Sequence, residues 1–247
     1  MENVNDYYFD GLYKEIWRAL IPDDLTTKEA DFIYQQFSLN PQSHVLDLMC
    51  GYGRHAIALA QKGVKVTAVD NLQAYISELE TKSIAEKLPI EAVCANVLTY
   101  TPTKEFDFVM CMGNSLNFFP PEQTQQILYN IAQGLKSGAV LYINSWSLAE
   151  TVIPSFIANA WSEVDGVKLL TECKYLFHPT RIESNTIMIT KDGREEHKKA
   201  VDYIFTVGEM EAMLNKAGFE MEDIYSIPGR KKFALGDKRA YIIARKK

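Results

Sequence analysis

The sequence lacks the features of a membrane protein and of a nucleic-acid-binding protein. No apolar run approaches the roughly 20 residues that a membrane-spanning helix needs. Acidic side chains outnumber basic ones by 32 to 26, so the formal net charge of -6 offers no general attraction for a polyanion. The first residues show no basic stretch followed by an apolar one, which argues against a secretory signal. We therefore expect a cytoplasmic protein that has neither a membrane nor a nucleic acid as its partner.

Histidine and cysteine are scarce too, with four of each, and neither shows a spacing typical of metal ligands. No CxxC pair is present. Three of the four cysteines lie in apolar, strand-like runs, where a free thiol packs as a small hydrophobic group. We expect reduced cysteines and no bound metal. The length of 247 residues and the hydrophobic content of 47% suffice for a substantial core.

Short apolar runs alternate with longer amphipathic ones over the middle of the chain. We predict strands at about 44–48, 65–70, 91–95, 106–112 and 139–145, with helices near 53–62, 72–87 and 121–136. Continuous apolar runs such as "KVTAVD" are typical of strands that are covered on both faces. The order strand, helix, strand indicates a parallel sheet with right-handed crossovers.

This alternation stops after Ser145. Residues 146–158 are typical of a loop and a short helix, and 167–206 of antiparallel strands with a hairpin at Asp192-Gly193. Residues 1–40 indicate two helices joined around Pro22, with Thr26 or Thr27 as the cap of the second. A helix at about 207–217 and strands at about 219–227 and 239–245 complete the pattern. The predicted parts are an N-terminal helical cap or lid (1–40), a core (41–145 and 207–247) and a β-rich insertion (146–206).

The stretch "HVLDLMCGYGRHAIALA" combines a buried strand, a carboxylate, two glycines and a helix. In an open parallel sheet, ligands bind beyond the carboxyl ends of the strands, where Asp47 lies. Gly51 and Gly53 let the main chain approach a ligand closely. The next predicted strand ends in Asp70, where a carboxylate can accept both hydroxyls of a ribose. Asp70 could also serve as a helix cap, and the two roles are compatible.

Two kinds of nucleotide cofactor fit this pattern. The glycines also satisfy the loose dinucleotide pattern, so an NAD-dependent oxidoreductase is one alternative. A pyrophosphate gains nothing from a carboxylate four residues before the first glycine, whereas an amino-acid ammonium group would meet Asp47 well. The chain also has no second nucleotide-binding half. A nucleoside that ends in an amino acid is the better fit.

With these motifs, residues 44–145 and 207–247 resemble a class I S-adenosylmethionine (SAM)-dependent methyltransferase. The resemblance implies a Rossmann-like, doubly wound α/β sheet, mostly parallel with an antiparallel last strand. It implies that "LDLMCGYG" holds the methionine part, that Asp70 holds the ribose, and that "CANV" at 94–97 lies against the adenine. Asn96 stands where the family often has an acid, and an amide can still accept from the adenine amino group. The expected SAM contacts are Asp47, Cys50, Gly51, Gly53, Asp70, Asn71, Asn96, Val97, Met112, Gly113 and Leu116.

A methyltransferase must align its acceptor behind the methyl group and exclude water. We expect a small-molecule acceptor that is methylated on nitrogen or oxygen, and a β-rich insertion that serves as a substrate cap or as the surface of a homodimer. If a base is needed, the candidates are Tyr8, Tyr13, His55, His178 and Tyr203, and the sequence does not choose among them. A SAM-binding protein without catalytic activity is a second alternative.

Three further segments have two interpretations each. The aromatic-rich stretch "DYYFDGLYKEIW" is either a lid over the cofactor or an amphipathic helix that packs on the sheet. Arg54 and His55 are either functional or merely solvated or space-filling beside the glycine turn. The segment "NSLNFFPP" at 114–121 resembles a motif of amino-methylating nucleic-acid enzymes, but its order is wrong, and we interpret it as a loop and a helix start.

Overall fold

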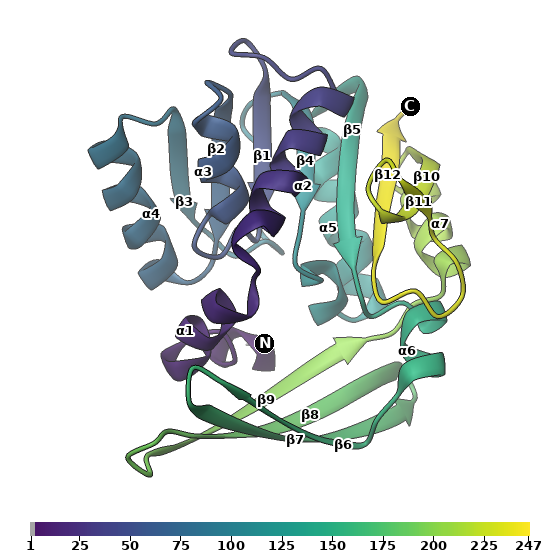
Figure 1. Ribbon diagram of the computed structural model, residues 1–247. Coiled ribbons are helices and arrows are strands. Elements are labelled where there is room, and N and C mark those ends of the chain that lie inside the picture. Colours follow the sequence, from purple (N-terminus) through teal and green to yellow (C-terminus); the bar gives the residue numbers. More distant parts are fainter. Residues whose placement is uncertain (1–2) are drawn as a thin grey trace.

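The computed structural model describes residues 3–247, apart from the side chain of Asp23. Its main sheet has eight strands in the order β11-β10-β12-β5-β4-β1-β2-β3 (Figure 1). These strands are β1 (His44–Leu48), β2 (Lys65–Asp70), β3 (Ile90–Cys94), β4 (Phe106–Cys111), β5 (Leu135–Ser145), β10 (Phe219–Ile227), β11 (Lys231–Lys232) and β12 (Ala240–Lys246). β1 to β5 pair in parallel, and β12 is antiparallel to both of its neighbours. The predicted Rossmann-like α/β fold with an antiparallel last strand is confirmed.

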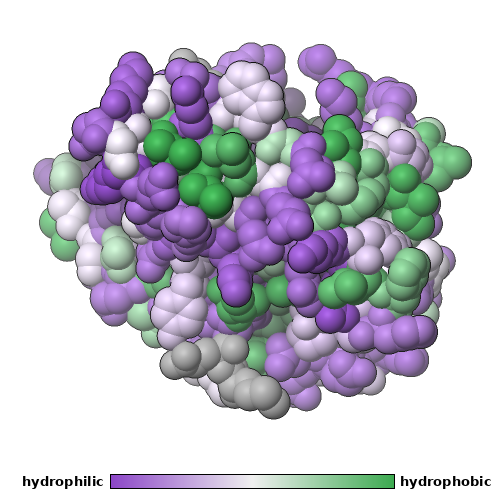
Figure 2. Space-filling model, turned by 90° about the horizontal axis from the view of Figure 1, so that it is seen from below, coloured by the Kyte–Doolittle hydropathy of each residue, from purple (hydrophilic) through white to green (hydrophobic). Residues whose placement is uncertain are grey.

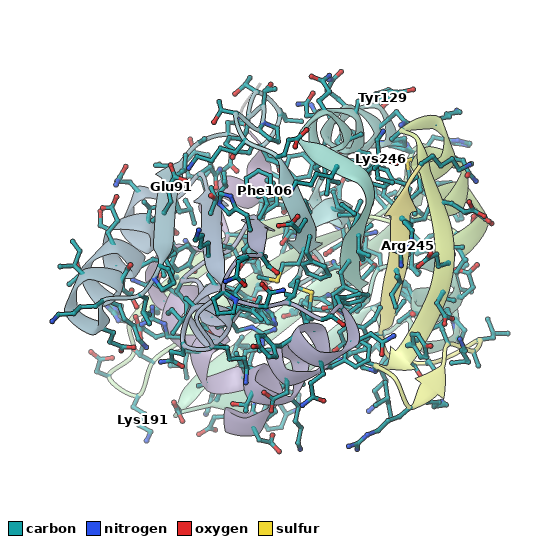
Figure 3. All side chains as sticks on the ribbon, turned by 90° about the horizontal axis from the view of Figure 1, so that it is seen from above. Glu91, Phe106, Tyr129, Lys191, Arg245 and Lys246 are labelled. Carbon is teal, nitrogen blue, oxygen red and sulfur yellow. The ribbon has the colours of Figure 1, made fainter. Side chains whose placement is uncertain are left out.

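Helices cover both faces of this sheet. On one face lie α2 (Asp23–Gln36), α3 (Arg54–Ala60) and α4 (Gln73–Glu86), and on the other α5 (Pro121–Gln133) and α7 (Val207–Lys216) (Figure 1). Each face has its own hydrophobic cluster, with Ile33 and Leu59 fully buried in the first and Ile127 and Leu214 in the second. Seen from above, Glu91 of β3, Phe106 of β4 and Arg245 of β12 follow one another across the sheet, with β10 and β11 beyond β12 (Figure 3).

A second, four-stranded antiparallel sheet lies below the carboxyl ends of the parallel strands (Figure 1). It is reached through α6 (Ala149–Ser155) and consists of β6 (Asn159–Val164), β7 (Val167–Phe177), β8 (Thr180–Ile189) and β9 (Glu195–Tyr203). The predicted hairpin forms between β8 and β9, with Gly193 at a φ of 85°. Between the two sheets lie a 3-10 helix, η1 (Val4–Tyr7), and α1 (Gly11–Leu20).

Two predicted boundaries were wrong, and one strand was not predicted. β5 begins at Leu135 rather than 139, because pairing with β4 overrides the polar break at Lys136 and Ser137 and is accommodated by an irregular register. β6, for which no element was predicted, is an edge strand whose residues 159–163 are exposed, so it has no apolar alternation to detect. α2 begins at Asp23, and the Thr26 hydroxyl accepts a hydrogen bond from Arg54 instead of capping the helix.

The first 40 residues divide at the predicted joint near Pro22. α2 packs on the main sheet as a core helix, because Ala30 and Ile33 are fully buried there. α1 instead buries Ile16 against Leu169 and Met188 of the second sheet. Only the segment before α2 therefore lies between the two sheets, and we call residues 3–20 the leading segment.

The outer face of the second sheet carries several apolar side chains among polar ones (Figure 2). Trp161, Leu170 and Phe177 are exposed on the strands of this sheet. The homodimer through the insertion stays a prediction.

Candidate functional site

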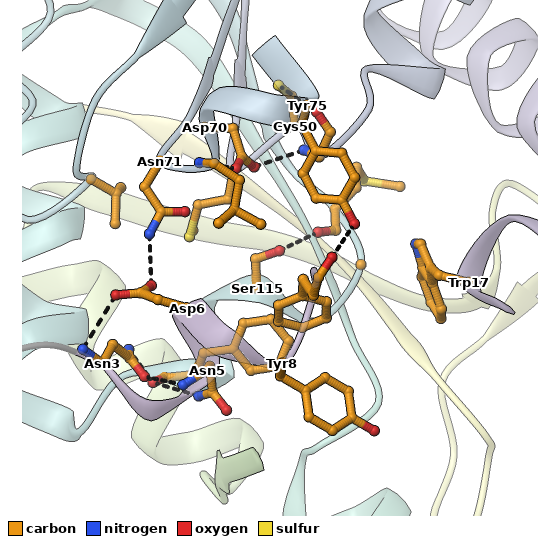
Figure 4. A pocket seen from close by; sticks show the side chains of 18 of the residues that line it. Asn3, Asn5, Asp6, Tyr8, Trp17, Cys50, Asp70, Asn71, Tyr75 and Ser115 are labelled. Atoms are coloured by element: carbon orange, nitrogen blue, oxygen red, sulfur yellow. Dashed lines mark hydrogen bonds between the residues drawn. The ribbon is translucent and has the colours of Figure 1, made fainter. Parts of the chain in front are cut away.

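A cavity of about 300 Å³ lies between the carboxyl ends of the parallel strands, the leading segment and the second sheet. Figure 4 shows that side chains from η1, from the glycine turn after β1 and from the end of β2 converge on it. Of the predicted cofactor contacts, the cavity is lined by Asp47, Cys50, Gly51, Asp70, Asn71, Asn96, Val97, Met112 and Gly113. Topology explains the convergence, because parallel neighbouring strands end at one edge of a sheet.

Asp70 holds the glycine turn against β2. One carboxylate oxygen accepts a 2.8 Å hydrogen bond from the Gly51 N–H and the other a 2.9 Å bond from the Leu72 N–H. Burial raises the pKa of Asp70, while these backbone donors lower it. The bond to Leu72 shapes the turn into α4, but Leu72 is the N-cap residue of that helix and no side chain caps it, so Asp70 orders the turn without capping the helix and still faces the cavity. Each oxygen keeps a second lone pair for a ligand.

Asp47 is the unsatisfied carboxylate of the site. Its side chain is 2% exposed, and its Oδ2 atom has no hydrogen-bond partner among the described residues. Burial raises the pKa of Asp47 to about 7, although the charge of Arg54 and a hydrogen bond from the Ala56 N–H lower it. An unpaired buried carboxylate oxygen is costly, and a cationic ligand group would offset that cost.

The two glycines of the turn serve different purposes. Gly51 has a φ of +56°, and a Cβ there would meet no atom within 4 Å, because it would project into open space. Gly53 has a φ of +77°, and a Cβ there would come within 2.6 Å of the Leu79 side chain. Gly51 leaves room beside the cavity, whereas Gly53 permits the close packing of α3 on α4. Gly53 itself does not line the cavity.

Two other expected residues differ in where the structure places them. Leu116 lies in the hydrophobic core and does not line the cavity, because η2 (Ser115–Phe118) turns it inward. Asn96 lines the cavity, but its side-chain oxygen already accepts a 2.9 Å hydrogen bond from the Leu98 N–H. One lone pair of that oxygen remains for an adenine amino group.

The leading segment closes one side of the cavity through its own polar side chains. Asp6 accepts a 2.6 Å hydrogen bond from the Asn71 amide, and Asn5 exchanges two bonds of 2.9 and 2.8 Å with the Val201 backbone in β9 (Figure 4 shows the first). The Tyr75 hydroxyl donates to the Phe9 carbonyl at 2.6 Å. The leading segment therefore spans the space between α4 and the second sheet, and it also packs on that sheet through Ile16.

The five candidate bases separate into two groups. Tyr8, Tyr13 and His55 line the cavity; His178 and Tyr203 do not. His178 lies in the exposed turn between β7 and β8, and Tyr203 packs against the core beside Asn117. The rings of Tyr8 and Tyr13 are 4.3 Å apart, and burial raises the pKa of both phenols. Both phenols are therefore protonated at neutral pH.

Arg54 and His55 belong to a buried ionic cluster. Glu29 of α2, which is 3% exposed, accepts hydrogen bonds from Arg54 at 2.8 Å, from His55 at 2.9 Å and from the Tyr241 hydroxyl at 2.6 Å. Burial opposes the ionisation of Glu29, but the bond from His55 and the charge of Arg54 outweigh it and lower its pKa to about 2. The cluster ties α2, α3 and β12 together behind the glycine turn.

Sequence reasoning missed Asp202 of β9, which lines the cavity opposite the glycine turn. Its Oδ1 atom accepts hydrogen bonds from the Asn114 amide at 2.8 Å and from the Ser147 hydroxyl at 3.2 Å. Burial raises the pKa of Asp202 to about 6. The signal was an acid in an otherwise apolar run, "AVDYIF", the same pattern that singled out Asp70 in "VTAVD". Trp17 and Trp146, with ring centroids 5.9 Å apart, complete the lining on this side.

Comparisons with known proteins agree with this geometry. Residues 45–138 match a family described as a methyltransferase domain. A carboxy-S-adenosyl-L-methionine synthase from Shewanella sediminis (strain HAW-EB3) is 22% identical over 214 residues, which cover 78% of this chain and 86% of that protein.

Two solved structures share the fold over nearly the whole chain. A SAM-dependent methyltransferase from Clostridium acetobutylicum ATCC 824 superposes with a TM-score of 0.82 at 19% identity, covering 95% of this chain and 96% of that one. CalS10 from Micromonospora echinaspora, an amino pentose methyltransferase solved with SAM bound, gives a TM-score of 0.73 at 19% identity, covering 96% and 98%. None of the helices within residues 3–247 combines the length and the apolar character needed to span a bilayer. The chain thus carries a match to a methyltransferase domain over residues 45–138 and shares its Rossmann-like fold with SAM-dependent methyltransferases.

Proposed function

We propose that this enzyme transfers the methyl group of SAM to a nitrogen or oxygen atom of a small molecule held in the cavity between the two sheets. The observation that carries the proposal is the composition of the cavity wall. Two strand-end carboxylates and a glycine turn form one side, and aromatic and polar side chains of the leading segment and the second sheet form the other. Cofactor and acceptor would thus meet inside one cavity.

The residues on the first side fit SAM. The unpaired Oδ2 atom of Asp47 is suited to the ammonium group of the methionine part. The open space at Gly51 leaves the main chain bare for a close contact. Asp70 is suited to the ribose hydroxyls, and Asn96 and Val97 to the adenine. These assignments of individual residues are part of the proposal.

On the second side, the chain would orient the acceptor and keep water away. When bound, SAM supplies an electrophilic methyl group on a sulfonium. Tyr8, Tyr13, Trp17 and Trp146 present aromatic faces to the same cavity, which favours a cationic group and excludes solvent. Orientation of the two reactants can account for much of the rate acceleration in such a transfer.

We infer a small acceptor from the way the leading segment covers the cavity. The leading segment bonds to α4 on one side and to β9 on the other, so it covers part of the cavity and narrows access to it. The similar CalS10 is an amino pentose methyltransferase, which supports a small acceptor for this chain as well. A polymer would need this segment to open.

Calorimetry with SAM, S-adenosylhomocysteine and NAD tests the cofactor site. We expect the first two to bind the wild type, NAD not to bind, and Asp70→Ala to bind at least about tenfold more weakly than the wild type. Glu220→Gln, which changes an exposed acid of β10, is the matched control. Transfer of a labelled methyl group to small amines and alcohols then tests the reaction. Tight NAD binding, or SAM binding that Asp70→Ala leaves unchanged, would contradict the proposed site.

A further inference from the structure

We infer that the acceptor is a small amine, whose ammonium group is held by Asp202 and gives one proton to the free oxygen of this carboxylate before methyl transfer. The inference rests on the proposed function and adds the chemical class of the acceptor and the residue that selects it. Asp202 is distinct from the cofactor side of the cavity, because β9 belongs to the second sheet, whereas Asp47 and Asp70 end strands of the main sheet.

The carboxylate of Asp202 is oriented by a rigid neighbour. Asn114 is fully buried and follows β4 with a φ of 69°. Its side-chain oxygen accepts from the N–H groups of Trp146 and Ser147 at 2.9 and 3.0 Å, so its amide nitrogen must face the other way. That nitrogen donates to Oδ1 of Asp202 at 2.8 Å. Among residues 3–247 no donor hydrogen-bonds to Oδ2, the second oxygen.

Asp202 also lacks a counter-ion. Within the described part of the chain, no Lys, Arg or His side chain pairs with it, and its two donors are a neutral amide and a hydroxyl. The buried acid Glu29 contrasts with it, since Arg54 and His55 compensate its charge. Asp202 is half-buried, and its partial desolvation makes a carboxylate without a cation costly to ionise, a cost that a cationic ligand offsets. The binding partner that best complements Asp202 is therefore an ammonium group.

The surroundings of Asp202 suit the same ligand. Tyr8, Tyr13, Trp17 and Trp146 line the cavity with it, and aromatic faces attract cations. The titratable groups that interact with Asp202 are Tyr8 and Tyr13 of the leading segment, with Cys173 of β7 close to Tyr8. Burial keeps both phenols protonated, and their ring centroids lie 4.3 Å apart. Asp202, whose pKa is raised to about 6, is ionised at neutral pH and can take up a proton.

The other acidic or basic groups that line the cavity are bound within the protein or lie on the cofactor side. Both oxygens of Asp6 accept hydrogen bonds, from the Asn71 amide and the Asn3 N–H, and Arg54 and His55 are bound to Glu29. Asp47 and Asp70 lie on the cofactor side, at the carboxyl ends of β1 and β2. Asp202 is thus the lining carboxylate that faces the acceptor side with a free oxygen.

The reaction balances as follows. One N–H bond of the ammonium breaks, and its proton moves to Oδ2 of Asp202. The freed lone pair of the nitrogen forms a bond to the methyl carbon, and the carbon–sulfur bond breaks with its electron pair left on sulfur. The products are an N-methylammonium ion and S-adenosylhomocysteine. Asp202 loses its proton to solvent when the product leaves.

Binding of amines to the complex with S-adenosylhomocysteine gives the first test. Ethanolamine, glycine and glucosamine serve as probes, and ethylene glycol, glycolate and glucose are the matched compounds without an amine. We expect at least one amine to bind to the wild type, none of the hydroxyl compounds to bind, and Asp202→Asn to lose the amine at least about tenfold. Binding of hydroxyl compounds but not of amines, or of no amine at all, would overturn the inference.

Methyl transfer from labelled SAM to the amine that binds gives the second test. We expect Asp202→Asn to lower kcat/KM by at least about 100-fold, to leave the affinity for SAM within about twofold, and to remove the loss of activity that the wild type shows below about pH 6. Asp202→Glu should restore part of the activity, and Glu195→Gln, an exposed acid on the same strand, should behave as the wild type. Full activity of Asp202→Asn would refute the role of Asp202. Wild-type protein that fails to bind SAM would instead refute the proposed function.

Discussion

Asn114 and Asp202, 88 residues apart in the chain, are joined by a 2.8 Å hydrogen bond between the amide of the first and the carboxylate of the second. Asn114 follows β4 of the main sheet, whereas Asp202 belongs to β9 of the insertion. The bond therefore fixes the two sheets relative to each other at the wall of the cavity. The two asparagines of "NSLNFF" therefore have a structural role, because both bond to the insertion. Asn117 makes a second such link by donating to the Tyr203 carbonyl at 2.8 Å.

The affinity for SAM should depend on pH through Asp47. The pKa of Asp47 is about 7 in the free protein, and the SAM ammonium group favours the ionised form. Protonation therefore competes with binding, and affinity should fall by up to tenfold per pH unit below about 7. Calorimetry between pH 5.5 and 7.5 in buffers of different ionisation enthalpy should show proton release on binding. Asp47→Asn should bind more weakly at pH 7.5 and lose this dependence; the same slope in the variant would exclude Asp47.

The two glycines of the turn should differ in what their replacement damages. In Gly51→Ala the new methyl group projects into the open space beside the cavity, where it would block the close approach of SAM. The positive φ should lower the free energy of unfolding by about 1–2 kcal/mol. The loss in the free energy of SAM binding should be larger than that. In Gly53→Ala the methyl group meets Leu79, so the free energy of unfolding should fall further. Urea denaturation and SAM titration of both variants separate the effects. Leu79→Ala removes the side chain that the new methyl group meets. Gly53→Ala should therefore lower the free energy of unfolding less in the Leu79→Ala variant than in the wild type.

Glu29 should make stability depend on pH in the acid range. Its pKa is about 2 in the folded protein, below the model-compound value of 4.5, so its contribution is fully present above 4.5 and is lost as the pH falls toward 2. Glu29→Gln leaves Arg54 without its buried partner and should lower the free energy of unfolding at pH 7 by about 3 kcal/mol. Denaturation between pH 3 and pH 7 checks this. The exposed-acid variant Glu220→Gln should keep the wild-type pH dependence, and an unchanged stability of Glu29→Gln would contradict the role of the cluster.

Asn5 should hold the leading segment in place. It is 3% exposed and makes two hydrogen bonds to the Val201 backbone. Asn5→Ala leaves these backbone groups without their partner, at a cost of about 1–3 kcal/mol. We expect faster hydrogen exchange at the Val201 amide and a severalfold faster dissociation of SAM. Asn215→Ala, on the exposed side of α7, is the control. Equal exchange at Val201 in both variants would show that Asn5 does not hold the segment.

Patterns along the chain determined the Rossmann-like sheet and the wall of the cavity at its strand ends. Local order sufficed there, because a strand, a glycine turn and a helix follow one another directly around Asp47 and Gly51. Asp70 ends the neighbouring parallel strand, so its proximity followed from topology alone. The edge strand β6 escaped detection because its exposed side chains leave no apolar periodicity.

The opposite wall of the cavity was decided only by tertiary structure. Tyr8, Trp17, Trp146 and Asp202 come from separate parts of the chain, and contacts such as Asn5 with Val201 bring them to one cavity. Whether His55 faces solvent or a buried carboxylate depended on Glu29 of another helix. Neighbours that are distant in sequence decide the protonation state of a carboxylate in a cavity and which of its oxygens lacks a hydrogen bond. The spacing of residues in the sequence could therefore not predict either property for Asp202.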